Sequence, residues 1–190
     1  MTTRKKPRKL KPGMLQESAL HYLGRYAASV ARLRQVMTRR IRNSAKAHEF
    51  DPTPLLTELE TVIATLIRTG LLNDASFAQA KALSLNRRGG SKRQIAGKLA
   101  VSGVRAPEAA HAIAQLEEEV PDAEFAAALA YAKRRRLGVF RSAPDESVER
   151  RRKDLASMAR AGFSLDLARR ALSQPEDSED WQSVARDILE

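Results

Sequence analysis

The stretch that decides the fold is residues 91–113, which read SKRQIAGKLAVSGVRAPEAAHAI. Ser91 suits the N-cap of a basic helix whose apolar positions recur at helical spacing. Gly103 suits the end of that helix, because glycine adopts the left-handed conformation without strain. A second helix is expected to start near Pro107, since proline is favoured in a first turn. The stretch therefore predicts two short helices joined by a tight turn.

Parts of this pattern recur on both sides of the stretch. Residues 29–41, which also begin with a serine, match the half that starts at Ser91. Residues 151–172 match the half that contains Gly103, with Gly162 in the equivalent place. Both alignments have an offset of about 60 residues. A shared period of this size is typical of a helical array rather than of one globular enzyme core.

Helical periodicity extends over most of the chain. In the first part of it, we expect a helix over residues 16–27, another from Ser29 through Ile41, a loop or a frayed helix end over residues 43–51, and a strongly amphipathic helix after Pro52. No segment sustains the apolar alternation of a strand. The predicted fold is all-α: three tandem three-helix units in an elongated array, at residues 16–72, 73–120 and 121–174, between a flexible basic tail at residues 1–15 and a flexible acidic tail at residues 175–190.

The composition indicates a basic protein with a thin helical core. The formal net charge is +11 at pH 7, hydrophobic residues make up 43% of the chain, and aromatic residues only 5%. A folded chain this basic is expected to bind a polyanion or an acidic assembly, including weak and non-specific nucleic acid binding. There is no cysteine, which excludes disulfides and thiolate metal sites. With no secretory signal or membrane span in the pattern, we expect a cytoplasmic monomer.

The sequence offers no active site. The histidines, at positions 21, 48 and 111, are scattered without the spacing of a metal-ligand pair. Residues 117–119 are three glutamates at a predicted helix end, where charge runs are normally solvated. No serine lies in a nucleophile elbow. We therefore expect a protein that is not an enzyme and that needs no cofactor or metal.

Residues 87–93, RRGGSKR, form the most informative basic cluster. A glycine pair leads into a helix N-terminus, where free amides and the helix dipole favour an anion, and four cations surround it. Contact with phosphate or an acidic partner and a merely solvated turn are both open interpretations. Further cations recur at residues 39–42, 133–136 and 150–153, which favours a continuous positive strip.

Three motifs resemble one known family. Residues 70–78 (GLLNDASFA), residues 87–95 (RRGGSKRQI), and Leu155–Phe163 with the RRAL of residues 169–172 are similar to the motifs of RecX-type regulatory proteins, in the same order and with similar spacing. The likeness covers roughly residues 18–173. The chain departs from the family pattern in its first unit, where residues 43–51 replace the usual tight turn after Ile41.

The resemblance implies a fold of three tandem three-helix units and a role in DNA repair and SOS regulation. It implies binding to the RecA recombinase and to its filament on single-stranded DNA, with inhibition of ATP hydrolysis, strand exchange and co-protease activity in most cases. The partner- or DNA-binding residues carried over from the resemblance are Arg87, Arg88, Lys92, Arg93 and Lys98, and those that rest mainly on charge are Arg134, Arg135, Arg151 and Arg152.

One alternative remains open, a sequence-specific DNA-binding protein of helix-turn-helix type. Three-helix units resemble that motif, whose recognition helix reads base edges with side chains such as Gln, Asn or Arg. On the helix that follows Ser91, Gln94 is the one clear candidate for such a contact.

Overall fold

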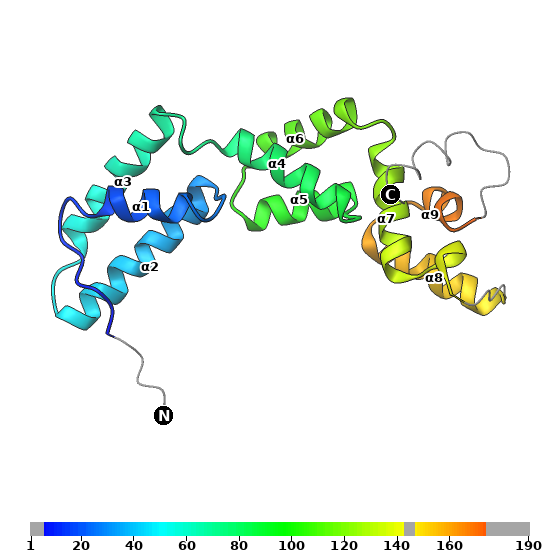
Figure 1. Cartoon of the computed structure of the whole chain (residues 1–190), viewed down its shortest axis with the longest axis horizontal. Helices are drawn as coiled ribbons and strands as arrows, with labels where there is room; N and C mark the ends of the chain where they lie inside the picture. Colours follow the sequence, from blue (N-terminus) through cyan, green and yellow to red (C-terminus); the bar gives the residue numbers. More distant parts are fainter. Residues whose placement is uncertain (1–5, 143–146, 174–190) are drawn as a thin grey trace. The chain divides into compact units, whose positions relative to one another are not determined.

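The computed structural model describes residues 6–142 and 147–173 of the chain. Within these residues all regular secondary structure is helical, with nine α-helices, one short 3-10 helix and no strand (Figure 1). The all-α prediction is therefore confirmed. The predicted acidic tail at residues 175–190 lies outside the described residues.

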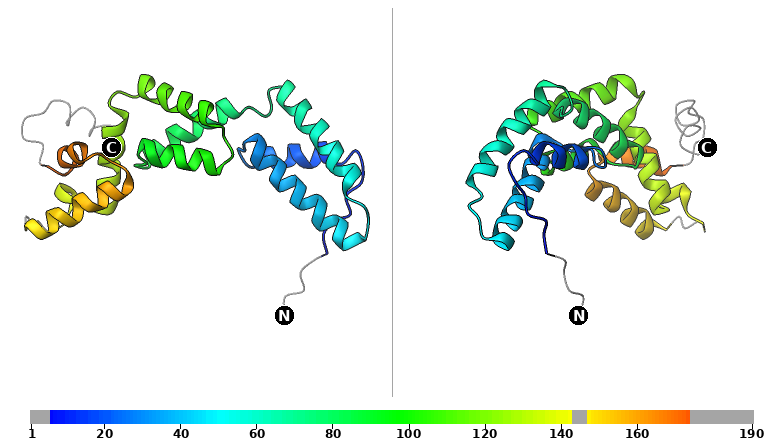
Figure 2. Two further views of the ribbon diagram at one scale, coloured as in Figure 1. Left: turned by 180° about the vertical axis from the view of Figure 1, so that it is seen from behind. Right: turned by 60° about the vertical axis from the view of Figure 1, so that its left-hand side comes forward.

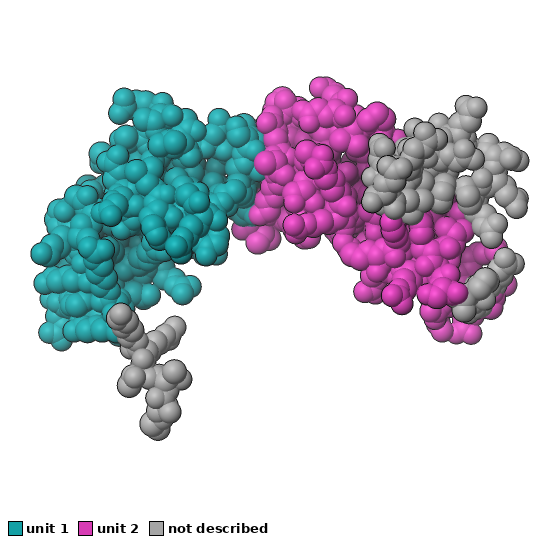
Figure 3. Space-filling view, viewed as in Figure 1, with its two compact units in different colours: residues 1–77, 102–104 teal, residues 78–101, 105–190 magenta. Residues whose placement is uncertain are grey.

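The chain divides into two compact units, shown in different colours in Figure 3. Unit 1 comprises Met1–Phe77 and Ser102–Val104, and unit 2 comprises Ala78–Val101 and Arg105–Glu190. Unit 1 contains the first predicted three-helix unit, and unit 2 contains most of the other two. The division into three units of three helices stays a prediction.

Unit 1 is built on three helices that pack against one another (Figures 1 and 2): α1 (Leu15–Leu23), α2 (Val30–His48) and α3 (Thr53–Arg68). Each helix buries one apolar stripe, as residues at three- and four-residue spacing share a helix face. The amphipathic helix expected after Pro52 is confirmed as α3. Its buried residues are Leu55, Leu59, Val62, Ile63 and Leu66.

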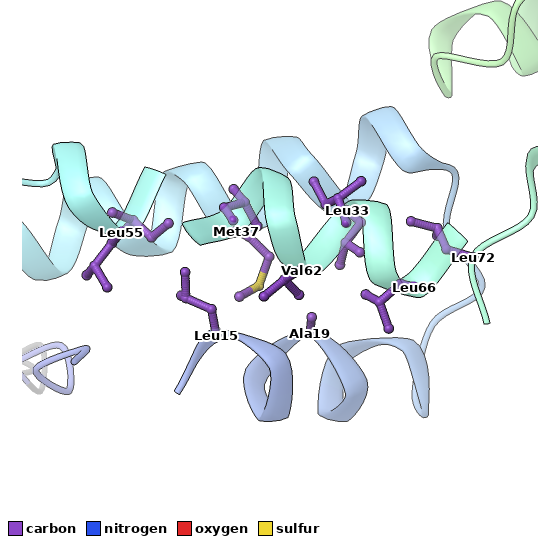
Figure 4. Packing of buried hydrophobic residues seen from close by; sticks show 11 residues of the cluster. Leu15, Ala19, Leu33, Met37, Leu55, Val62, Leu66 and Leu72 are labelled. Atoms are coloured by element: carbon purple, nitrogen blue, oxygen red, sulfur yellow. The ribbon is translucent and has the colours of Figure 1, made fainter. Parts of the chain in front are cut away.

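The core of unit 1 lies where α1 meets the other two helices. In Figure 4, Leu15 and Ala19 of α1 point toward Met37 of α2 and Val62 of α3. Leu15, Ala19 and Met37 are completely buried. Full burial of a leucine or methionine side chain contributes about 1.5–3 kcal/mol, and burial of alanine contributes less, so this cluster accounts for much of the stability of unit 1.

Helix α2 is longer than the sequence predicts. The segment of residues 43–51, expected to be a loop or a frayed helix end, is helical as far as His48, because Ser44 and Ala45 are buried against the rest of unit 1. Glu49 then adopts the left-handed conformation, with φ of 51°, and ends the helix. Of the two alternatives for this segment, the structure has the helix end, because two small residues of this polar stretch face the core.

The N-terminal segment is held against α2 where the sequence predicts disorder. The backbone amide of Leu10 donates to the Ser44 hydroxyl oxygen at 2.9 Å, and that hydroxyl donates to the carbonyl oxygen of Arg8 at 3.1 Å. Leu10 also packs on the core of unit 1. One buried serine and one leucine therefore order part of a segment whose composition is typical of a free tail.

Unit 2 contains most of α4 (Asp74–Arg87), together with α5 (Lys92–Val101), α6 (Ala106–Glu119), α7 (Ala123–Arg135), the 3-10 helix Gly138–Phe140, α8 (Val148–Ala161) and α9 (Leu165–Leu172). Helix α5 packs on α6, and α9 packs on both α7 and α8. The largest apolar cluster of unit 2 lies among these last three helices. It includes Phe125, Leu129, Met158 and Phe163.

Candidate interaction surface

The turn between α4 and α5 is held tightly against α7. After α4 ends, the amide of Gly89 donates to the carbonyl of Asn86 at 2.7 Å, and the amide of Gly90 donates to the carbonyl of Leu85 at 2.9 Å. Gly89 has a φ of +75°, and a Cβ there would lie 2.5 Å from the backbone nitrogen of Tyr131. Both the backbone conformation and the close approach of α7 therefore require glycine at this position.

Ser91 joins the start of α5 to the end of α8. Its hydroxyl oxygen accepts a hydrogen bond from the amide of Gln94 at 3.2 Å, as an N-cap does, and the hydroxyl donates to the carbonyl of Ala161 at 2.6 Å. Gly162 follows with a φ of +98°, and a Cβ there would lie 2.6 Å from the Ser91 hydroxyl oxygen. This pairing of a capping serine with a glycine-ended helix is called the serine joint below.

The same serine joint recurs inside unit 1. Ser29 caps α2 by accepting from the amide of Arg32 at 3.1 Å, and its hydroxyl donates to the carbonyl of Ser102. Gly103, with φ of +78°, packs against Ala31. The sequence repeat that aligns Ser29 with Ser91 and Gly103 with Gly162 therefore has a structural cause. Ser29 meets Gly103 in one joint, and Ser91 meets Gly162 in the other.

A carboxylate completes each serine joint. In unit 2 the amide of Lys92 donates to Glu124 Oε2 at 3.0 Å, and in unit 1 the amide of Val30 donates to Asp74 Oδ1 at 2.8 Å. Burial raises the pKa of the half-buried Glu124 carboxyl, while the hydrogen bond from the Lys92 amide and the Lys92 charge act in the opposite direction. The first turn of α5 therefore already binds an anion, a carboxylate of the protein itself.

This arrangement adds intramolecular contacts to residues 87–93, whose contact with a partner stays a prediction. Two of the four cations predicted to face a partner take part in the fold. Lys92 forms an ion pair with Glu117, and Arg93 donates from Nη2 to the carbonyls of Arg160 at 3.1 Å and Ala159 at 3.4 Å. A guanidinium at the last carbonyls of α8 stabilises the end of that helix.

Arg88 and Arg134 are brought together by the same turn. The Arg134 guanidinium donates to the carbonyl of Arg88 and lies 5.5 Å from the centre of the Tyr131 ring. Arg87 and Arg135 lie at the C-terminal ends of α4 and α7, and both are exposed. The basic ends of these two helices therefore form one exposed cluster around the glycine pair.

The other predicted contact residues lie apart from this cluster. Lys98 is exposed in the last turn of α5, about 9 Å along the helix axis from Lys92. Arg151 and Arg152 are exposed near the start of α8, about 13 Å along that helix from the end that Arg93 contacts. The continuous positive strip that the sequence favours stays a prediction.

Sequence reasoning missed the contacts of Glu124 and Asp74 with the starts of α5 and α2. It also missed the aromatic residues beside the outer face of α2. An acidic residue in a first turn is the ordinary sign of a favourable helix-dipole contact, and it does not reveal that the carboxylate binds a different helix. The outer face of α2 carries exposed arginines beside Tyr22 and Tyr26, and the sequence indicated only its cations. Among the described residues, no group of acidic, histidine or cysteine side chains could hold a metal ion. No described helix is long and apolar enough to span a bilayer.

Comparison with known proteins identifies the family. The chain is 44% identical over 168 residues to the regulatory protein RecX of Myxococcus xanthus, and the match spans 88% of this chain and 89% of that protein. The chain belongs to the RecX family. The resemblance that the three motifs indicated is thus confirmed.

Other RecX proteins extend this match. The RecX of Agrobacterium fabrum is 28% identical over 172 residues, which span 90% of this chain and 88% of that protein. The crystal structure of RecX from Lactobacillus salivarius superposes with a TM-score of 0.59 at 16% identity, and covers 92% of this chain and 94% of that one. This last likeness shows that the helical fold is the RecX fold. No protein-family model matches the chain.

Proposed function

We propose that this protein is a non-enzymatic regulator that binds the RecA recombinase and its filament on single-stranded DNA. In this proposal it mostly inhibits ATP hydrolysis, strand exchange and co-protease activity, in DNA repair and SOS regulation. The observation that carries the proposal is the 44% identity to a regulatory protein RecX along 88% of the chain. Regulation by binding alone agrees with the relatives' description as regulatory proteins.

The exposed cluster around the glycine pair supports binding to an acidic partner. The side chains of Arg87 and Arg88 are exposed and form no ion pair within the described part of the chain. Tyr131 and Gly89 hold the turn in place, so the two cations are presented on an ordered backbone. Preorganised charges bind at a lower entropic cost than charges on a flexible loop.

Binding of the regulator to the filament inhibits RecA if the regulator binds one conformational state of the filament more tightly than the other. A ligand shifts a conformational equilibrium by its differential affinity for the two states. ATP hydrolysis and strand exchange require the filament to cycle between states, and a bound regulator that prefers one of them slows the cycle. The regulator itself performs no chemistry in this scheme.

The structure gives less support to a helix-turn-helix reader of DNA sequence. The recognition helix would be α5, whose exposed cations are Arg93 and Lys98. Arg93 is bound to the end of α8, and Gln94 is only partly exposed. Direct readout needs side chains that reach base edges in the major groove, and α5 presents no such set.

The test is the DNA-dependent ATP hydrolysis of RecA, titrated with the wild-type protein at fixed salt. We expect inhibition by the wild type, and the double variant Arg87→Glu with Arg88→Glu should require about tenfold more protein or more, since each lost pair becomes a like-charge contact. The matched control is Lys46→Glu with Arg68→Glu, two exposed cations in the last turns of α2 and α3. It should inhibit like the wild type.

Two outcomes would contradict the proposal. Equal inhibition by the wild type and the Arg87 and Arg88 variant would exclude this cluster as the contact. Absence of any effect of the wild type at every ratio would exclude RecA regulation altogether.

A further inference from the structure

The outer face of α2 carries two grooves in unit 1 that the proposed function does not use. Gln35, Arg39 and Asn43 follow one another at four-residue spacing and are exposed, so they form a ridge along the helix. A groove of about 520 Å³ lies on each side of this ridge, and all three residues line both grooves.

One of the two grooves also contains aromatic rings. Tyr22, at the end of α1, and Tyr26, just after it, line this groove together with Arg40 of α2. The centres of the two rings are 5.1 Å apart with an angle of 37° between the planes, and the Arg40 guanidinium lies 5.7 Å from the centre of the Tyr22 ring. Tyr26 is 56% exposed, so its ring is available for a further contact.

The charge of this aromatic groove is positive, because it contains arginines and none of the described residues that line it is acidic. Arg39 and Arg40 are exposed along the groove. In the neighbouring groove, by contrast, Arg34 is neutralised by an ion pair with Glu60 at 2.9 Å. The aromatic groove therefore combines unneutralised cations with exposed ring faces.

We propose that the aromatic groove binds a single-stranded nucleic acid, with a base stacked on Tyr26 and phosphates bound by Arg39 and Arg40. Proteins that bind single strands combine a positive groove with aromatic faces, because every base has a π-face and every nucleotide has a phosphate. The groove volume of about 520 Å³ suits a nucleobase rather than a duplex. An acidic peptide would use the cations and leave the ring faces without a partner.

The test uses naked oligonucleotides and no RecA, so it is separate from the test of the proposed function. Fluorescence anisotropy compares a labelled single-stranded oligothymidylate of about 15 nucleotides with an abasic strand of equal length and charge. We expect the wild type to bind the base-bearing strand at least about fivefold more tightly. Tyr26→Ala should abolish that preference, Tyr26→Phe should retain it, and Tyr26→Trp should increase it.

The cations are tested by the salt dependence of the same binding. Arg39→Gln should weaken binding to both strands and reduce the slope of log K against log salt by about 0.7. Arg68→Gln removes one exposed charge from the end of α3 and serves as the matched control, whose slope should equal that of the wild type. Helicity measured by circular dichroism confirms that each variant is folded.

Equal affinity of the wild type for the base-bearing and abasic strands would overturn the proposal. Displacement of the oligonucleotide by polyglutamate as effectively as by unlabelled oligothymidylate would also overturn it, and would assign the groove to an acidic polypeptide.

Discussion

Gly89 shows how one residue fixes the basic turn between α4 and α5. Gly70 has nearly the same backbone conformation, with φ of +73° against +75°, yet a Cβ at Gly70 would meet nothing within 4 Å. At Gly89 a Cβ would meet the backbone of Tyr131. The two glycines therefore separate the cost of a left-handed conformation from the cost of a steric clash.

We predict that Gly70→Ala lowers the free energy of unfolding by about 1–2 kcal/mol, the cost of left-handed backbone for an ordinary residue. Gly89→Ala should cost about 3 kcal/mol or more, because backbone atoms of α7 must also move. Urea denaturation of both variants measures the difference. Equal costs would show that α7 does not approach the turn closely.

The limits of sequence reasoning are clear at this residue. The glycine pair predicts a break between two helices. The structure has this break at the same place, between the end of α4 and the start of α5. Tyr131 lies far along the chain, and nothing near Gly89 in the sequence indicates that the backbone of another helix packs against it. Local conformational preference is encoded locally, whereas the packing partner is set by the fold.

At the scale of elements, the start of α5 is stabilised by Glu124 from α7. Burial raises the pKa of this carboxyl above its usual value of 4.5. At pH values between the usual and the raised pKa, the folded state binds more protons than the unfolded state. The contribution of this group to stability therefore falls as the pH rises through that window.

We predict that Glu124→Gln removes this fall, so that the stability of the variant relative to the wild type increases from about pH 4 to about pH 7. Urea midpoints measured across this range provide the test. The control is Glu118→Gln, an exposed change of equal charge on α6. If the wild-type and Glu124→Gln curves run parallel, the carboxylate is not held in a desolvated position.

Periodicity predicted most helices well, because each buries a stripe at three- and four-residue spacing. Helix α3 is the clearest case, and the predicted cap at Ser91 is also confirmed. The sequence left the end of α2 open between a loop and a helix end, since the burial of Ser44 depends on a segment that precedes the helix in the chain. The contacts of Lys92 with Glu117 and of Arg93 with the end of α8 were not predicted, because these residues are remote from them in sequence.

At the scale of the whole molecule, the two units have separate apolar clusters. Leu59 belongs to the cluster of unit 1 and Leu129 to that of unit 2, and each is 1% exposed. No residue is shared between the two clusters in the described chain. Two cores of this kind do not guarantee a single cooperative unfolding transition.

We predict two resolvable transitions in scanning calorimetry. Leu59→Ala should destabilise one of them by about 2–5 kcal/mol, and Leu129→Ala should destabilise the other by a similar amount, as expected for leucine truncation in a core. Each variant serves as the control for the other. A shift of both transitions by either variant would show that the units unfold as one.

The serine joints have a consequence for the order of folding. Ser91 and the carbonyl of Ala161 are 70 residues apart, and Ser29 and the carbonyl of Ser102 are 73 apart. Single helices form within about a microsecond from local contacts, whereas a joint must close a loop of this length before it gains anything. The joints are therefore late events, made after the helices that they connect. They are also the natural first places for the chain to open when it is pulled or warmed.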